Sequence, residues 1–197
     1  MTRVDSLLRW LRSPTAAWST IGAFLLFIVA TGLLLGLCPY GQMAQQLSML
    51  GLRPLEERLG YSPADVHLLL ECLGDPGRHL FRQALRFDLF YPLAFVPALA
   101  LGIAVPFSRV LKNGRPALWL TAFPLLCAPC DWLEDGLLLS LLSAFPHENA
   151  RLVGVASVVT ATKLLLVRAS LFLVLLGLLL ASGRWLLQRA RQAPASR

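Results

Sequence analysis

The sequence predicts an all-α, polytopic membrane protein: a single membrane domain over residues 1–197, with four transmembrane helices and an amphipathic helix in the first outer loop. Three observations predict this class. The 197 residues are 56% hydrophobic and only 15% charged, whereas ordinary soluble domains carry about 25% charged residues. Four stretches are long and apolar enough to cross a bilayer. The basic residues behind the net charge of +7 lie mostly beside these stretches, where they indicate membrane orientation.

The four spans follow from length, because a helix needs about 20 residues to cross the hydrocarbon core. We place them at about residues 16–37, 87–107, 117–141 and 154–183, followed by a polar tail at 190–197. The first stretch is longer than the roughly 7–15 apolar residues of a signal peptide and lacks a small-residue cleavage site, so we expect a retained anchor. The third and fourth stretches exceed one crossing, so we expect them to tilt, to project into water, or to break at Pro124 and Pro129.

Orientation follows from the basic flanks. Basic residues flank the first span on its N-terminal side, fill the loop between the second and third spans, and recur in the C-terminal tail: Arg3, Arg9, Arg12, Arg109, Lys112, Arg115, Arg184, Arg189, Arg191 and Arg197. The loop between the third and fourth spans has only Arg151. Because basic loops stay in the cytoplasm, we expect a multi-pass protein of the bacterial inner membrane with both termini cytoplasmic.

The outer loop, residues 38–86, carries helix signals. Ser62-Pro63-Ala64-Asp65 reads as an N-cap, a first-turn proline and an acid that reaches back. Val66, Leu69, Leu70 and Leu73 follow at helical spacing, and Gly74 ends the segment. We expect this amphipathic helix to lie on the outer membrane surface or against the bundle. A second helix should start at Asp75-Pro76 and run into the second span.

Gly32 and Gly36 in the first span form a G-x-x-x-G spacing, which lets two helix backbones approach closely. This spacing arises easily by chance in a stretch so rich in leucine and glycine. We therefore expect ordinary packing within the chain at these glycines rather than a surface for a second copy.

The third span contains three acids where apolar residues are expected. Asp131 and Glu134 share one helical face with Cys127 and Cys130, and Asp135 lies at its edge. An acid at the membrane centre costs at least about 2.5 kcal/mol, so this face must look toward protein or water. Lys163 in the fourth span lies at the same depth as Glu134, each about eleven residues from the loop that joins the two spans, so a pair is expected.

Further polar residues complete the candidate site. Asp88, near the outer end of the second span, is expected to join the cluster, and three arginines are expected to line its mouth: Arg78, Arg82 and Arg86. Arg168 lies about 140° around the helix from Lys163 and cannot share its face. Three alternatives stay open at this point: a purely structural salt-bridge cluster, a Lys163 that snorkels to the surface, and acids that reach outer water.

The four cysteines suggest a different chemistry. Cys127-Ala128-Pro129-Cys130 is a C-x-x-C, and Cys38 and Cys72 lie at or beyond the outer membrane face. This layout resembles that of the quinone-linked thiol oxidases, the disulfide-bond-forming membrane proteins and vitamin K epoxide reductases, in the count and spacing of cysteines alone. A buried thiol among carboxylates is a poor nucleophile, and free cysteine is a common core residue. A zinc site from these cysteines with Asp131 or Glu134 lacks the usual second ligand pair, so we predict no metal site and no cofactor.

Several short motifs occur in order along the chain: Leu73-Gly74-Asp75-Pro76-Gly77-Arg78, Asp88 with Pro92, Asp131-Trp132-Leu133-Glu134, and Lys163. This order resembles an uncharacterised group of bacterial four-span membrane proteins with the pattern G-x-x-G-R, D-x-x-x-P, D-x-x-E-N and a late lysine. The resemblance covers about residues 55–163 and implies the architecture and candidate residues, not an activity. Asp135 stands where the pattern has Asn, which adds an acid that needs a neutralising partner. The C-x-x-C is not part of the pattern, which weakens the redox hypothesis.

From these observations we expect a membrane protein that binds or passes a small molecule, a lipid or a proton at the acidic and basic cluster. Its expected partners are membrane lipid and a small hydrophobic ligand. The alternatives are a structural or assembly membrane protein and a quinone-linked thiol oxidoreductase. Nucleic-acid binding has no support, because the basic residues are dispersed along membrane flanks.

Overall fold

The computed structural model describes residues 3–37, 39–147 and 149–192, and all regular structure within these residues is helical. The helices are α1 (Arg3–Leu11), α2 (Pro14–Gly36), α3 (Pro39–Met49), the short 3₁₀ helix η1 (Leu55–Glu57), α4 (Pro63–Asp88), α5 (Pro92–Val110), α6 (Arg115–Leu120), α7 (Ala122–Ala144) and α8 (Ala150–Gln192). The predicted all-α class is therefore confirmed.

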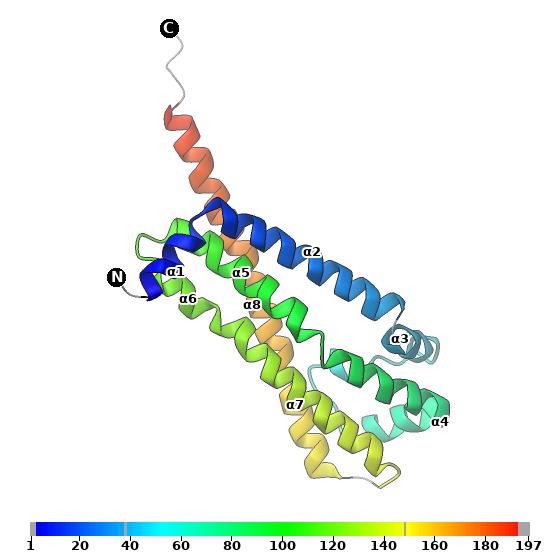
Figure 1. Ribbon diagram of the computed structural model, residues 1–197. Coiled ribbons are helices and arrows are strands. Elements are labelled where there is room, and N and C mark those ends of the chain that lie inside the picture. Colours follow the sequence, from blue (N-terminus) through cyan, green and yellow to red (C-terminus); the bar gives the residue numbers. More distant parts are fainter. Residues whose placement is uncertain (1–2, 38, 148, 193–197) are drawn as a thin grey trace.

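Helices α2, α5, α7 and α8 run along the molecule, and the other segments, including the bent α4, lie toward its two ends (Figure 1). Helix α8 packs against α5 and α7, and α2 packs against α5. At one end lie α1, α6 and the C-terminal part of α8, which projects beyond the other helices (Figure 1). At the opposite end α3 packs against α4, and η1 contacts α8. The N-terminal and C-terminal helical ends therefore lie on the same side of the molecule.

Three helices in the described chain are long and apolar enough to cross a membrane: α2, α5 and α8. The predicted third span is not among them, because its three acids lie within α7. The chain also breaks at Thr121, between α6 and α7, close to Pro124. Pro129 lies inside α7 and does not end it. The fourth predicted span lies within the 43-residue α8, and the projection of this helix beyond its neighbours accounts for the extra length.

The segment between α2 and α5, predicted as the first outer loop, contains the expected N-cap. Ser62 Oγ accepts a hydrogen bond from the Asp65 backbone N–H, and the Asp65 carboxylate accepts one from the Ser62 backbone N–H. The Ser62 hydroxyl also donates to the exposed Asp65 carboxyl, and this bond, with the one from the Ser62 backbone N–H, holds the pKa of that carboxyl below its usual range. The apolar side chains of the following turns are buried in a core with α3, α7 and α8, so the helix lies against the bundle.

Helix α4 bends at Gly74, whose φ of 61° and ψ of −179° are not helical. The expected end of the first segment is therefore present. The expected continuous run of the second segment into the second span is wrong, because the chain leaves the helix after Asp88 and starts α5 only at Pro92. Proline at the first turn of α5 removes a backbone N–H that the preceding segment would need to continue as a helix.

The predicted close packing at Gly32 and Gly36 is wrong for the described residues, because nothing lies within 4 Å of the position of a Cβ on either glycine. Between α2, α5 and α8 the close approaches occur instead at Gly102 and Gly177. A Cβ on Gly102 would lie 2.9 Å from the Phe24 ring, and one on Gly177 would lie 3.0 Å from the Phe107 ring. These glycines let α2 and α8 pack closely on α5.

Candidate functional site

The centre of the polar cluster is Lys163, which is buried between α7 and α8. Its Nζ lies 3.1 Å from Asp131 Oδ1 and also contacts Glu134 Oε2. Thr160 donates a hydrogen bond of 2.5 Å to Glu134 Oε1. All four side chains are at least nine-tenths buried. The pairing of Lys163 with the acidic face is the contact that the matched depths predicted.

The local sequence explains this arrangement. Asp131 and Glu134 are three residues apart on α7, and Thr160 and Lys163 are three residues apart on α8. Residues at this spacing lie on the same side of a helix. Because the two helices are connected by a short loop and pack along their length, each polar pair faces the other. The side chains that α7 turns outward are apolar and exposed: Leu125, Leu126, Trp132 and Leu133.

Two further aspartates extend the cluster toward α4. One carboxylate oxygen from each of Asp88, Asp131 and Asp135 lies within 4.8 Å of the others. The Trp132 indole N–H donates a 2.9 Å hydrogen bond to the Leu89 carbonyl, which fixes the end of α4 beside α7. Asp135 is completely buried, and neither of its oxygens has a hydrogen-bond partner among the described residues.

Glu56 is a member of the cluster that sequence reasoning missed. It lies in η1, is 6% exposed, and neither carboxylate oxygen has a hydrogen-bond partner in the described chain. Burial raises its pKa to about 8; the Glu134 carboxylate adds to the rise and Lys163 opposes it. The neighbouring Glu57 is exposed, so no sequence signal distinguishes the buried glutamate from the exposed one.

Tyr61 holds the outer loop against α8. Its backbone N–H donates to Ser157 Oγ at 3.0 Å, and its hydroxyl lies 3.1 Å from Thr160 Oγ1. Burial raises the pKa of Tyr61 to about 12, so the hydroxyl stays neutral and can donate. A continuous polar chain therefore runs from the outer loop through Thr160 to Glu134 and Lys163. The polar stripe Ser157, Thr160 and Lys163, at three-residue spacing in an apolar helix, is a signal that could have identified these partners.

The charges of this cluster do not balance. In the described chain five buried carboxyl groups surround one buried ammonium group: Glu56, Asp88, Asp131, Glu134, Asp135 and Lys163. An ionised carboxylate in a low-dielectric interior is strongly disfavoured unless a positive charge or several donors face it. The carboxyl groups that do not face Lys163 are therefore stable at these positions only in the neutral form or beside a further compensating group.

The three predicted mouth arginines lie elsewhere. Arg78 donates to the Leu70 carbonyl at 2.7 Å, pairs with Asp75, and stacks over the Phe145 ring at 4.6 Å. Arg78 and Arg82 line a separate polar pocket of about 480 Å³. Arg86 and Arg168 are exposed. Arg78 therefore stabilises the bend of α4 through local contacts.

The three described cysteines are free thiols. Cys127 is buried and donates a weak hydrogen bond to the Phe123 carbonyl, Cys130 is partly buried, and Cys72 is exposed. Cys38 lies outside the described residues. The residues that offer a metal-ligand set here are aspartates and include no cysteine.

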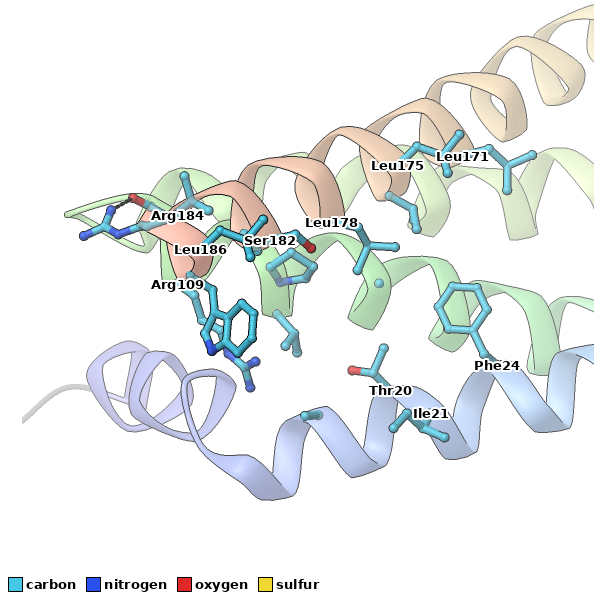
Figure 2. A pocket seen from close by; sticks show the side chains of 18 of the residues that line it. Thr20, Ile21, Phe24, Arg109, Leu171, Leu175, Leu178, Ser182, Arg184 and Leu186 are labelled. Carbon is cyan, nitrogen blue, oxygen red and sulfur yellow. Dashed lines mark hydrogen bonds between the residues drawn. The ribbon is translucent and has the colours of Figure 1, made fainter. Parts of the chain in front are cut away.

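A large apolar cavity lies between α2, α5 and α8, on the side of the molecule that carries the helical termini. Its volume is about 1180 Å³. Figure 2 shows Thr20, Ile21 and Phe24 on α2 and Leu171, Leu175 and Leu178 on α8 around this space. Two basic side chains, Arg109 and Arg184, also line it.

Comparison of the chain with known protein families, with curated proteins and with solved structures finds no match.

Proposed function

We propose that this chain is a four-span protein of the bacterial inner membrane that binds protons or a small cation at the buried acidic cluster. The observation that carries this proposal is the excess of buried carboxyl groups over the buried ammonium group of Lys163. Ionisable groups within membrane helices commonly mark ion and proton sites. Their burial costs free energy, so they are retained where they are paired or have a function. Pairing with Lys163 accounts for two of the five carboxyls.

The fourth span in this proposal is α7 with the preceding α6. Its acids face protein, and the large side chains that it exposes are apolar. The exposed hydroxyls of Ser140 and Ser143 donate to carbonyls of the same helix, so they need no partner in lipid. Four crossings put both termini on one side of the membrane, in agreement with the positions of α1 and the end of α8 (Figure 1). The basic flanks then assign that side to the cytoplasm.

Infrared spectroscopy of the purified protein tests proton binding. In chelator, the protein should show a protonated-carboxyl band near neutral pH that decreases as the pH rises, with matching proton release to an indicator dye. The band should be smaller in Asp135→Asn and unchanged in Glu71→Gln, which alters an exposed acid of α4. An unchanged band between pH 5 and 9 in the parent protein would mean that the cluster is a fixed structural network.

The two alternative functions have weaker support. A structural role explains the pair of Lys163 with Asp131 and Glu134 but not the unpartnered oxygens of Asp135. Thiol redox chemistry requires an accessible thiolate, whereas Cys127 is buried.

Binding of an anionic phospholipid is a second candidate function, favoured by the apolar cavity between α2, α5 and α8. The cavity walls match an acyl chain, and Arg109 and Arg184 place positive charge where a lipid phosphate would lie. Each arginine donates a hydrogen bond to a backbone carbonyl, of Ser13 and Val110 respectively, and keeps further N–H groups for a ligand.

Native mass spectrometry of protein released from anionic lipid nanodiscs tests this second function. The parent should retain an anionic phospholipid, and Leu178→Trp should retain less of it because the larger side chain occupies part of the cavity. Leu179→Trp is the matched control, because Leu179 is 71% exposed and does not line the cavity. Equal lipid retention by both variants would exclude the cavity as the lipid site.

A further inference from the structure

We infer that Asp88, Asp131 and Asp135 form a binding site for one hard divalent cation. This inference rests on the proposed function and names the class of cation that the cluster takes. One oxygen from each aspartate lies within 4.8 Å of the other two. Two oxygens bound to the same Ca²⁺ or Mg²⁺ are at most about 4–5 Å apart, so the three groups are already at coordinating separation.

A second observation points to a ligand at this position. Asp135 is completely buried, and both of its oxygens lack a hydrogen-bond partner among the described residues. Asp131 is 3% exposed. Its Oδ1 contacts Lys163, whereas its Oδ2 has no hydrogen-bond partner among the described residues. Buried carboxylate oxygens are normally hydrogen-bonded or bound to a metal. These bare oxygens belong to two of the three aspartates whose oxygens lie within 4.8 Å of one another, Asp131 and Asp135.

The charge balance favours a divalent cation over a monovalent one. With the carboxyl of Glu56 neutral and those of Asp88, Asp131, Glu134 and Asp135 ionised, the single ammonium of Lys163 leaves a net charge of −3. One divalent cation reduces this to −1, and protonation or water can accommodate the remainder. The ammonium of Lys163 pairs with Asp131 and Glu134, and neither oxygen of Asp135 has a hydrogen-bond partner among the described residues.

The ligand atoms define the class of metal. An all-carboxylate set suits Mg²⁺, Ca²⁺ or Mn²⁺, whereas zinc and copper sites use thiolate or imidazole ligands. Three oxygens leave coordination positions for water or for a group of a substrate. Two ligands come from adjacent turns of α7 and one from the last residue of α4. Cation binding would therefore tie the outer segment to the bundle.

Titration of the chelator-treated protein with Mn²⁺, followed by the loss of the free-Mn²⁺ paramagnetic resonance signal, tests the site. We expect one Mn²⁺ per chain in the parent and at least a tenfold weaker affinity in both Asp135→Asn and Asp88→Asn. Glu71→Gln should bind like the parent, because Glu71 is an exposed acid on the same α4 as Asp88. Mg²⁺ or Ca²⁺ should compete with Mn²⁺ and raise the thermal unfolding temperature of the parent but not of the two Asn variants.

Two outcomes would overturn the inference. One is the absence of stoichiometric Mn²⁺ binding in the parent, and the other is unchanged affinity in a folded Asp88→Asn or Asp135→Asn variant. Circular dichroism and a monodisperse elution profile establish folding, and two independent variants guard against one that fails to fold. If Mn²⁺ does not bind but the same protein still releases protons from its carboxyl groups, the cation site is wrong and the proposed function stands. If neither occurs, both are wrong.

Discussion

The ammonium of Lys163 contacts two buried carboxylates, so its removal should destabilise the protein strongly. Loss of one partner of a buried ion pair typically costs about 3–5 kcal/mol, because the other charge is left unpaired. We expect Lys163→Met to lower the thermal unfolding temperature in detergent strongly. Lys163→Met combined with Glu134→Gln should recover much of this loss, because Glu134 then carries no charge to strand. Additive losses from the two single changes would mean that the groups do not interact.

The contribution of Glu56 to the stability of the folded chain should depend on pH, and its direction follows from the raised pKa. Its pKa rises from an ordinary value near 4.5 to about 8 because of burial. Below pH 4.5 the carboxyl is neutral in both folded and unfolded chains. As the pH rises, the unfolded chain ionises first, so stability falls until the folded pKa is passed. The gain in unfolding temperature from Glu56→Gln should therefore be small at pH 4 and largest above pH 8.

The exposed neighbour provides the control for this measurement. Glu57→Gln is the same chemical change one residue along η1, on a side chain that faces solvent. It should show no comparable growth of the difference with pH. A parallel pH dependence in both variants would assign the effect to general surface charge rather than to burial.

Individual site residues differ in how far the sequence could predict them. Asp131, Glu134, Asp135 and Lys163 stand out because charges interrupt apolar helices, and Asp88 because it follows an arginine-rich segment. Glu56 could not be found, since its burial depends on how a short 3₁₀ turn packs against α8. The arginines were placed at the mouth from linear proximity, but the bend at Gly74 turns Arg78 toward Leu70, Asp75 and Phe145.

The bend of α4 depends on the backbone freedom of one glycine. Gly74 has φ +61° and ψ −179°, a region almost restricted to glycine, where other residues incur roughly 1–3 kcal/mol of strain. Gly74→Ala should therefore lower the unfolding temperature by several degrees. Gly154→Ala, at an open position inside α8, should be neutral or slightly stabilising because alanine favours the helix. Equal changes in the unfolding temperatures of the two variants would mean that a side chain at residue 74 does not strain the bend.

Elements with local signals were predicted well, and their junctions were not. The N-cap at Ser62, the end of the first segment at Gly74 and the apolar stretch of α2 each depend on residues that are neighbours in the sequence. The break between α4 and α5 and the close contacts at Gly102 and Gly177 depend on packing between distant helices. A G-x-x-x-G spacing alone does not say which glycine another helix will meet, which is why Gly32 and Gly36 were misassigned.

At the scale of the whole molecule, the two ends differ in chemistry. One end carries the acidic cluster under a cap of α3, η1 and α4, and the other carries the apolar cavity with Arg109 and Arg184 (Figures 1 and 2). The core around Phe95, Leu99 and Ile103 separates them. This polarity matches a protein whose cluster exchanges protons or cations with the outer side while basic residues contact the cytoplasmic leaflet.

The number of membrane crossings decides whether both termini lie on the cytoplasmic side and the acidic cluster lies toward the outer side, as proposed. If α7 crosses with α2, α5 and α8, both termini lie on one side; if it does not, three crossings put them on opposite sides. Reporter fusions after residues 51 and 147 should report the outside, and fusions after residue 112 and at the C-terminus should report the cytoplasm. A cytoplasmic signal after residue 147 with an outside C-terminus would mean that α7 does not cross. Its buried acids would then face a site reached from the cytoplasm.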